Sequence, residues 1–184
     1  MSNPLFQNPW VTVDTVDATT GSGEPYQHTR ITMPPGAVVL PFTRSRGRTL
    51  VGLVKTARPV LGDTLIEFPR GGTSDRSREE AFRELGEEFG LGDAVLTLPH
   101  RYLGEVLPDS GIMNHRIDVW AAYLDPSAVE ATEGFREDET GGVVLWWTTD
   151  MLRSAIKAGT VRDSFTLSSL LLAELHGVFD DLGL

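Results

Sequence analysis

The sequence predicts an α/β protein in which strands and helices alternate, with a β-hairpin extension at the N-terminal end. Apolar runs typical of strands and segments of helical spacing are interleaved along the chain. The 184 residues, of which 40% are hydrophobic, are enough to bury one sizeable core. No internal repeat or linker divides that core, so we expect an N-terminal β extension over residues 1–34 and a main domain over residues 35–184.

The first half of the chain indicates two hairpins. Residues 10–16 and 26–33 have strand character, and the glycines and proline between them indicate a turn. Residues 37–42 and 49–55 are apolar runs, and the charged, glycine-containing residues 44–48 suit the tip of a hairpin. We therefore expect the second pair to form central strands.

A short extended segment at residues 65–68 ends at Pro69, and the glycines that follow it allow tight backbone turns. The pattern Ser77-x-x-Glu80 is a capping box, and Gly90 suits a helix C-terminus. A helix is therefore expected over residues 78–89. Its apolar face consists of Ala81, Phe82, Leu85 and Phe89.

The second half of the chain continues the alternation. We expect strands at residues 103–106, 117–123 and 143–147, with an acidic loop over residues 130–140. A helix capped by Thr148 or Thr149 is expected to run to Lys157, and a final helix to begin at Ser164.

Composition limits the classes of function. The chain contains no Cys, which excludes disulfides, thiolate zinc ligands and Cys nucleophiles. The absence of an apolar leader or a membrane-length apolar run favours a soluble, cytoplasmic protein with no membrane partner. A net charge of −10 argues against a nucleic-acid partner, but it leaves phosphate-bearing small molecules open, because a divalent cation reverses the local sign of an acidic site.

Four glutamates share one face of the predicted helix. Their spacing puts Glu80, Glu84, Glu87 and Glu88 on the side opposite the apolar residues. Like charges at i,i+4 cost an isolated helix about 0.2–0.5 kcal/mol per pair, so a compensating group is expected. That group is either a set of neighbouring arginines or a Mg²⁺ ion, which prefers carboxylate oxygens.

The segment from Arg83 to Leu91, Arg-Glu-Leu-Gly-Glu-Glu-Phe-Gly-Leu, resembles the second half of the Nudix box at every specified position. The resemblance implies a Nudix hydrolase with a mixed sheet between helices, a Mg²⁺ cofactor with Mn²⁺ as the alternative, and cleavage of a diphosphate linkage. It also implies that Glu84, Glu87 and Glu88 bind the metals, with the Gly71 carbonyl as a further ligand, and that Arg83 orients the glutamates.

The first half of the box departs from the family pattern. Asp75 stands where the box has Glu, and the loop from Gly71 to Asp75 is shorter than usual. Asp75 is either the N-cap of the helix or a residue that fixes the loop or binds a metal through water.

Outer segments resemble the ADP-ribose pyrophosphatases. Residues 53–59 are similar to the Leu-Val-Arg-Gln-Tyr-Arg-Pro segment of that subgroup, and residues 66–71, Ile-Glu-Phe-Pro-Arg-Gly, to its Glu-Leu-Pro-Ala-Gly. Residues 103–111 and 158–167 are similar to two later segments. The resemblance implies a small-molecule nucleoside diphosphate sugar as substrate, ADP-ribose first, and a homodimer formed through the N-terminal hairpin.

By the same resemblance, Arg58 holds a substrate phosphate and Glu67 lies beside the metals or the substrate. The alternative is that these two residues only pair with each other. Trp10 and Tyr26 either pack in the core or an interface, or stack on adenine. His115 is interpreted as a surface or packing residue.

The water-activating base is expected in the acidic loop, where Glu139 is the first choice and Glu137 the second. Glu84 is the rival, because some Nudix enzymes use that position. A non-catalytic nucleotide-sugar sensor, or a hydrolase of GDP-mannose or of a dinucleotide polyphosphate, remain the alternative functions.

Overall fold

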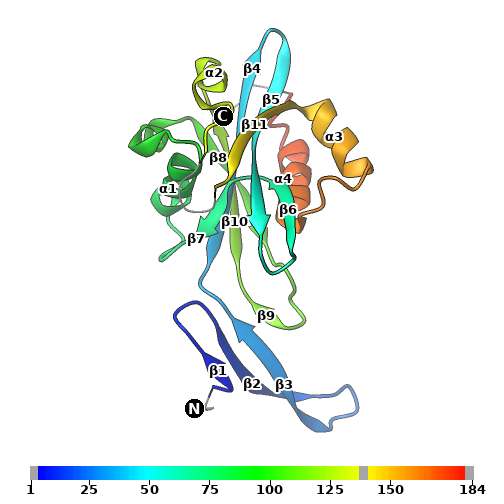
Figure 1. Ribbon diagram of the computed structural model, residues 1–184. Helices are drawn as coiled ribbons and strands as arrows, with labels where there is room; N and C mark the ends of the chain where they lie inside the picture. The colour runs from blue at the N-terminus through cyan, green and yellow to red at the C-terminus, as the bar shows by residue number, and fades with distance from the viewer. Residues whose placement is uncertain (1–3, 137–140, 181–184) are drawn as a thin grey trace.

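A computed structural model describes residues 4–136 and 141–180 of the chain. Figure 1 shows a larger β-sheet with helices around it and a smaller sheet that extends from one end. The larger sheet contains β4 (Gly36–Ser45), β5 (Arg48–Arg58), β6 (Asp63–Glu67), β7 (Arg70–Gly72), β8 (His100–Val106), β10 (Ile117–Tyr123) and β11 (Val143–Thr148). The smaller sheet contains β1 (Phe6–Gln7), β2 (Thr12–Thr19), β3 (Pro25–Thr32) and β9 (Met113–Asn114).

The larger sheet is mixed, with the strand order β11-β5-β4-β10-β8. Strand β4 pairs antiparallel with β5 and parallel with β10, in a register that places Gly36 opposite Ile117. The β4–β5 hairpin turns at Arg46 and Gly47, which have φ values of +50° and +74°. The two predicted central strands and their charged tip are therefore confirmed.

Helices cover both faces of this sheet. They are α1 (Arg78–Glu88), α2 (Ser127–Thr132), α3 (Thr149–Lys157) and α4 (Ser164–Leu175) within the described residues, besides a short 3-10 helix at Gly92–Thr97. Successive side chains of β4 point to opposite faces. Val38 and Leu40 join a core cluster with residues of α3 and α4, whereas Val39 joins a second cluster with residues of α1. The chain is thus a mixed α/β protein.

The smaller sheet confirms the predicted N-terminal hairpin. Strands β2 and β3 pair antiparallel from Thr12 opposite Thr32 to Thr19 opposite Pro25. Strand β9 adds in parallel to β3, and it comes from the loop between β8 and β10. The main segment of the chain therefore contributes a strand to the N-terminal extension.

The helix boundaries agree with the sequence except in the acidic loop. The expectation of a loop from residue 130 is wrong, because α2 extends to Thr132. The Asp125 carboxylate accepts a hydrogen bond from the backbone N–H of Ser127 at the start of α2, and the Thr132 hydroxyl donates to the carbonyl of Ala128 at its end. Side chains therefore stabilise both ends of this short helix. No helix in the described part of the chain is long and apolar enough to cross a membrane.

Candidate functional site

The helix that carries the glutamates begins at a cap that the sequence predicts. The Ser77 side chain accepts a hydrogen bond from the backbone N–H of Glu80, at 3.3 Å. The alternative of Asp75 as N-cap is wrong, because Asp75 lies two residues before Ser77 and accepts a hydrogen bond from the backbone N–H of Ser77, at 2.8 Å. Arg76 has a left-handed φ of +61° and donates from Nε to Asp118 on β10, at 2.8 Å. This ion pair ties the short loop to the sheet.

Arg83 lies among the glutamates of α1. Its Nη1 donates to Glu87 at 2.7 Å, its Nη2 pairs with Glu84, and its Nε lies 3.7 Å from Glu80. The hydrogen bond to Glu87, with the charges of Glu84 and Glu80, raises the pKa of Arg83. The predicted ion pairing of Arg83 with the glutamates is therefore present, and it compensates the like charges on this face.

Gly71 allows the Glu84 side chain to approach β7. A Cβ atom on Gly71 would lie 2.1 Å from Cδ and 2.2 Å from Oε2 of Glu84. Gly71 pairs with Ala37 of β4, so its backbone is held in the sheet. The sequence needs glycine here because any side chain would displace the Glu84 carboxylate.

A cleft of about 720 Å³ lies between this helix face and the sheet. The predicted residues that line it are Arg58, Gly71, Arg83, Glu84 and Glu87. Glu80 lines it as well, whereas Glu67 and Glu88 do not. The fold therefore gathers into one cleft residues that come from β5, β7 and α1.

Glu88 is the last residue of α1, and its side chain is partly buried. Its Oε2 atom has no hydrogen-bond partner among the described residues. Burial first, and then the negative charges of Glu84 and Glu67, raise the pKa of Glu88 to about 8, against the opposing charge of Arg58. A buried carboxylate oxygen that lacks a donor and lies near other carboxylates is favourable for a divalent cation, and oxygen is the donor that Mg²⁺ prefers.

The acidic side chains do not yet form a ready metal centre. Within residues 4–136 and 141–180, no group of three or more carboxylates or imidazoles is close enough to hold an ion. Glu84 and Glu87 both pair with Arg83, so a cation would have to replace the guanidinium as their partner. The donors fit the cation in chemistry and position, but these side chains would have to turn to bind it.

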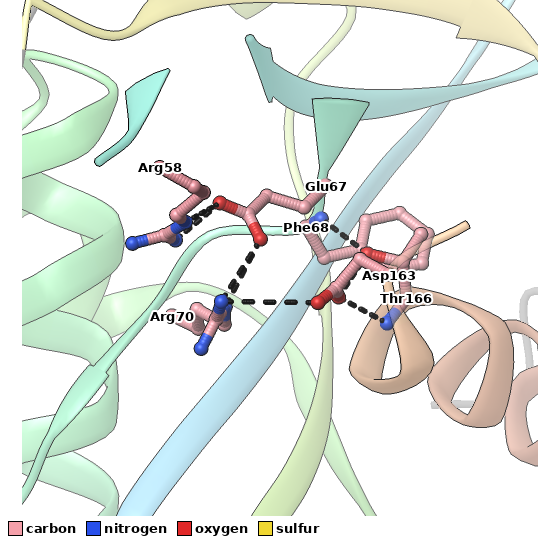
Figure 2. Close-up of polar contacts among 6 residues, drawn as sticks. All are labelled: Arg58, Glu67, Phe68, Arg70, Asp163 and Thr166. Carbon is pink, nitrogen blue, oxygen red and sulfur yellow. Dashed lines mark hydrogen bonds and ion pairs between the residues drawn. The ribbon is translucent and has the colours of Figure 1, made fainter. Parts of the chain in front are cut away.

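Glu67 is a buried carboxylate held by two arginines, as Figure 2 shows. Arg58 donates from Nε to Glu67 Oε1 at 2.6 Å, and Arg70 donates from Nε to Glu67 Oε2 at 3.1 Å. The alternative in which Arg58 pairs with Glu67 is therefore observed. The pairing does not remove Arg58 from the cleft, because 30% of its side chain remains exposed.

Among the cleft residues that were not predicted as site residues are Arg70 and His115. Arg70 lines the cleft, and the only signal in the sequence was its position directly before Gly71. His115, interpreted as a surface or packing residue, lines it as well. Burial and the charge of Arg70 lower the pKa of His115. Trp10 also lines the cleft with a highly exposed ring, whereas Tyr26 does not.

The two loop candidates for the catalytic base, Glu137 and Glu139, lie outside the described residues. Their roles stay predictions.

Comparison with models of known protein families finds no match for this chain, and a search of curated proteins finds none either.

Proposed function

We propose that this chain is a Nudix-type hydrolase that uses Mg²⁺ to cleave the diphosphate linkage of a nucleoside diphosphate sugar. ADP-ribose is the first candidate substrate, with AMP and ribose 5-phosphate as products. The pattern from Arg83 to Leu91 supports the family, and the segments around Arg58 and Glu67 support the subgroup.

One observation carries the proposal most directly. Glu84 approaches the backbone of Gly71 so closely that no Cβ would fit, and both residues line the cleft. The approach brings the Glu84 carboxylate next to the backbone of Gly71 in β7. A carboxylate and a backbone carbonyl are the two kinds of oxygen donor expected for the metal. A surface helix with a merely solvated acidic face would not need this approach.

Glu84, Glu87 and Glu88 would hold the cation, with the Gly71 carbonyl as a further donor and Mn²⁺ as the alternative ion. When bound, the ion supplies Lewis-acid polarisation of the diphosphate and a lower pKa for bound water. Oxygen ligands of this kind suit Mg²⁺, which usually keeps waters and substrate phosphates as its other ligands.

The side chains of the cleft have their own tasks in this proposal. Arg58 binds a phosphate oxygen with its guanidinium and keeps the linkage in place, while Glu67 keeps that guanidinium oriented. Arg83 forms ion pairs with Glu84 and Glu87 in the absence of the cation, and the cation would replace its guanidinium as their partner. A carboxylate accepts the proton of the attacking water, with Glu139 as the first candidate, Glu137 as the second and Glu84 as the rival.

The chain is also proposed to act as a homodimer through its N-terminal sheet. The exposed apolar side chains Leu5, Phe6 and Trp10 lie in and beside β1. Pairing of two such extensions would cover apolar surface that a monomer leaves in water.

A second candidate function is a nucleotide-sugar sensor that binds without hydrolysis. Its support is the engagement of Glu84 and Glu87 by Arg83, which leaves no ready three-ligand metal centre in the described residues.

The test is hydrolysis of a panel that contains ADP-ribose, GDP-mannose and a dinucleotide polyphosphate, in Mg²⁺ and in EDTA. Glu88→Gln is expected to lose the Mg²⁺-dependent activity. Glu79→Gln is the matched control, because Glu79 lies on the same helix, is exposed and pairs with Arg78 outside the cleft. Binding of one compound with no hydrolysis above the Glu88→Gln rate would reject the enzyme and favour the sensor.

A further inference from the structure

Arg70 stands where the ADP-ribose pyrophosphatase segment that this chain resembles has Ala. Its side chain lines the cleft together with Arg58, and 27% of that side chain is exposed. The sheet side of the cleft therefore presents two guanidinium groups, while the helix side carries Arg83 among the glutamates Glu80, Glu84 and Glu87.

Three neighbours hold the Arg70 guanidinium in one orientation. Glu67 accepts from its Nε, and the Nη2 atom lies 3.1 Å from the same carboxylate oxygen. Asp163, the N-cap of α4, lies 3.7 Å from Nη2. The guanidinium carbon lies 4.9 Å from the centre of the Phe165 ring, which fixes the plane of the group.

Asp163 is itself held rigidly at the start of α4. Its Oδ2 accepts hydrogen bonds from both the backbone N–H and the hydroxyl of Thr166, each at 2.9 Å. The Thr166 hydroxyl accepts from the backbone N–H of Phe68, at 3.0 Å. Figure 2 shows this chain of contacts, which extends from the start of α4 through Arg70 and Glu67 to Arg58.

The contacts leave part of the Arg70 guanidinium available. Among the described residues, Nε and Nη2 contact carboxylates, whereas Nη1 makes no hydrogen bond. Nη1 lies on a side chain that lines the cleft, so it can donate to an anion there. A guanidinium that is already oriented loses little entropy when it binds a phosphate.

We propose that Arg70 is a second phosphate-binding residue, which together with Arg58 binds a ligand with two adjacent phosphates, and that Asp163 is its positioning residue. The inference rests on the proposed function for the identity of the ligand. Two oriented guanidinium groups that share one carboxylate suit neighbouring phosphates better than a single phosphate. They also offset the repulsion between a diphosphate and the acidic helix face.

Binding of ADP in Mg²⁺, measured by calorimetry, tests the inference without relying on turnover. Arg70→Ala introduces the residue that the ADP-ribose pyrophosphatase segment has at this position. It is expected to raise the dissociation constant of ADP by about 10- to 100-fold, which corresponds to the loss of a charge-assisted hydrogen bond. The KM for ADP-ribose should rise in the same proportion, with a smaller effect on kcat. Arg162→Ala removes the same charge from an exposed pair with Asp63 outside the cleft, so it should leave both constants unchanged.

The alternative is that Arg70 only neutralises Glu67. In that case Arg70→Ala would lower the melting temperature and leave the ADP dissociation constant unchanged, which would overturn the inference. If Arg70→Ala does not fold, Arg70→Lys decides, because it keeps the charge beside Glu67 but cannot serve the carboxylate and a phosphate together. Weaker ADP binding in that variant supports the inference, and wild-type binding refutes it.

Asp163→Asn tests the positioning residue. Asn is as good an N-cap as Asp, so α4 should keep its stability, while the charge next to Arg70 is lost. We expect the KM for ADP-ribose to rise less than in Arg70→Ala, while the melting temperature stays unchanged. An unchanged KM would show that Asp163 does not position Arg70.

The two proposals fail in different ways. A protein that hydrolyses nothing but binds ADP through Arg70 would reject the hydrolase and keep the inference. Unchanged hydrolysis of ADP-ribose by the Arg70→Ala variant would keep the hydrolase proposal and reject the inference about Arg70. A wild-type protein that does not bind ADP would reject the inference.

Discussion

Replacing Glu88 by Gln is expected to stabilise the metal-free protein at neutral and alkaline pH and to leave its stability unchanged under acid conditions. The reason is that the Oε2 atom of Glu88 is buried, has no hydrogen-bond partner in the part of the chain that the structure describes, and lies near the charges of Glu84 and Glu67. Gln has nearly the same shape and carries no charge. The variant therefore removes the ionised form without leaving a cavity.

The size of the effect follows from the pKa of Glu88, which rises from its ordinary value of 4.5 to about 8 in the folded protein. Between these values the folded state binds more protons than the unfolded state, so the stability of the wild type falls as the pH rises. Each pH unit in this interval costs about 1.4 kcal/mol. The variant should therefore gain on the wild type by about 3 kcal/mol at pH 7, and by nothing well below pH 4.5.

Urea unfolding of both proteins in EDTA, from pH 5 to pH 8, measures the difference. Glu79→Gln is the control, since Glu79 is exposed and its pKa is lowered by its hydrogen bond with Arg78, so it stays ionised throughout this range. Addition of Mg²⁺ should stabilise the wild type more than Glu88→Gln. A difference in unfolding free energy that does not change with pH would refute the buried-charge argument.

The close approach at Gly71 and the exposed apolar side chains beside β1 can each be tested by substitution. Gly71→Ala should change the melting temperature little, because the flexible Glu84 side chain can move away, but it should reduce Mg²⁺-dependent hydrolysis as strongly as Glu84→Ala. The control is Gly72→Ala, where a Cβ meets nothing within 4 Å. Wild-type activity in Gly71→Ala would contradict the proposed site. Light scattering should give twice the mass of one chain for the wild type and the mass of one chain when Leu5 and Phe6 are both replaced by Ser. A monomeric wild type would end the dimer proposal.

The local elements could be predicted because short-range chemistry decides them. The Ser77 cap and the apolar spacing of Ala81, Phe82 and Leu85 are enough to define where α1 begins and which side it buries. The same spacing predicted the shared side of Glu80, Glu84 and Glu87, and Arg83 lies within one turn of each of them. Glu88, predicted on the same side, does not line the cleft. The hairpin at Arg46 and Gly47 was predicted for a similar reason.

The exception at Asp75 has a cause outside the local sequence. Asp and Ser both suit an N-cap, and the sequence offered one of each, two residues apart. The ion pair of Arg76 with Asp118 anchors the loop in the left-handed conformation that precedes the cap. That partner is on a distant strand, so nothing near Asp75 in the sequence could decide between the two positions.

The sequence by itself determined the acidic helix, its capping, the strands of both hairpins and the motif on which the proposed function depends. Only the tertiary structure decided that Arg70 and Asp163, which lie far apart in the chain, share the Glu67 carboxylate network, and that His115 reaches the same cleft. The physical reason is the range of the interactions. Helix capping and hydrophobic spacing act within a few residues, whereas the cleft exists because β7 pairs with β4 and α1 packs against both strands. The contact of Arg70 with Asp163, which lies much later in the sequence, likewise depends on the packing of α4 against the sheet.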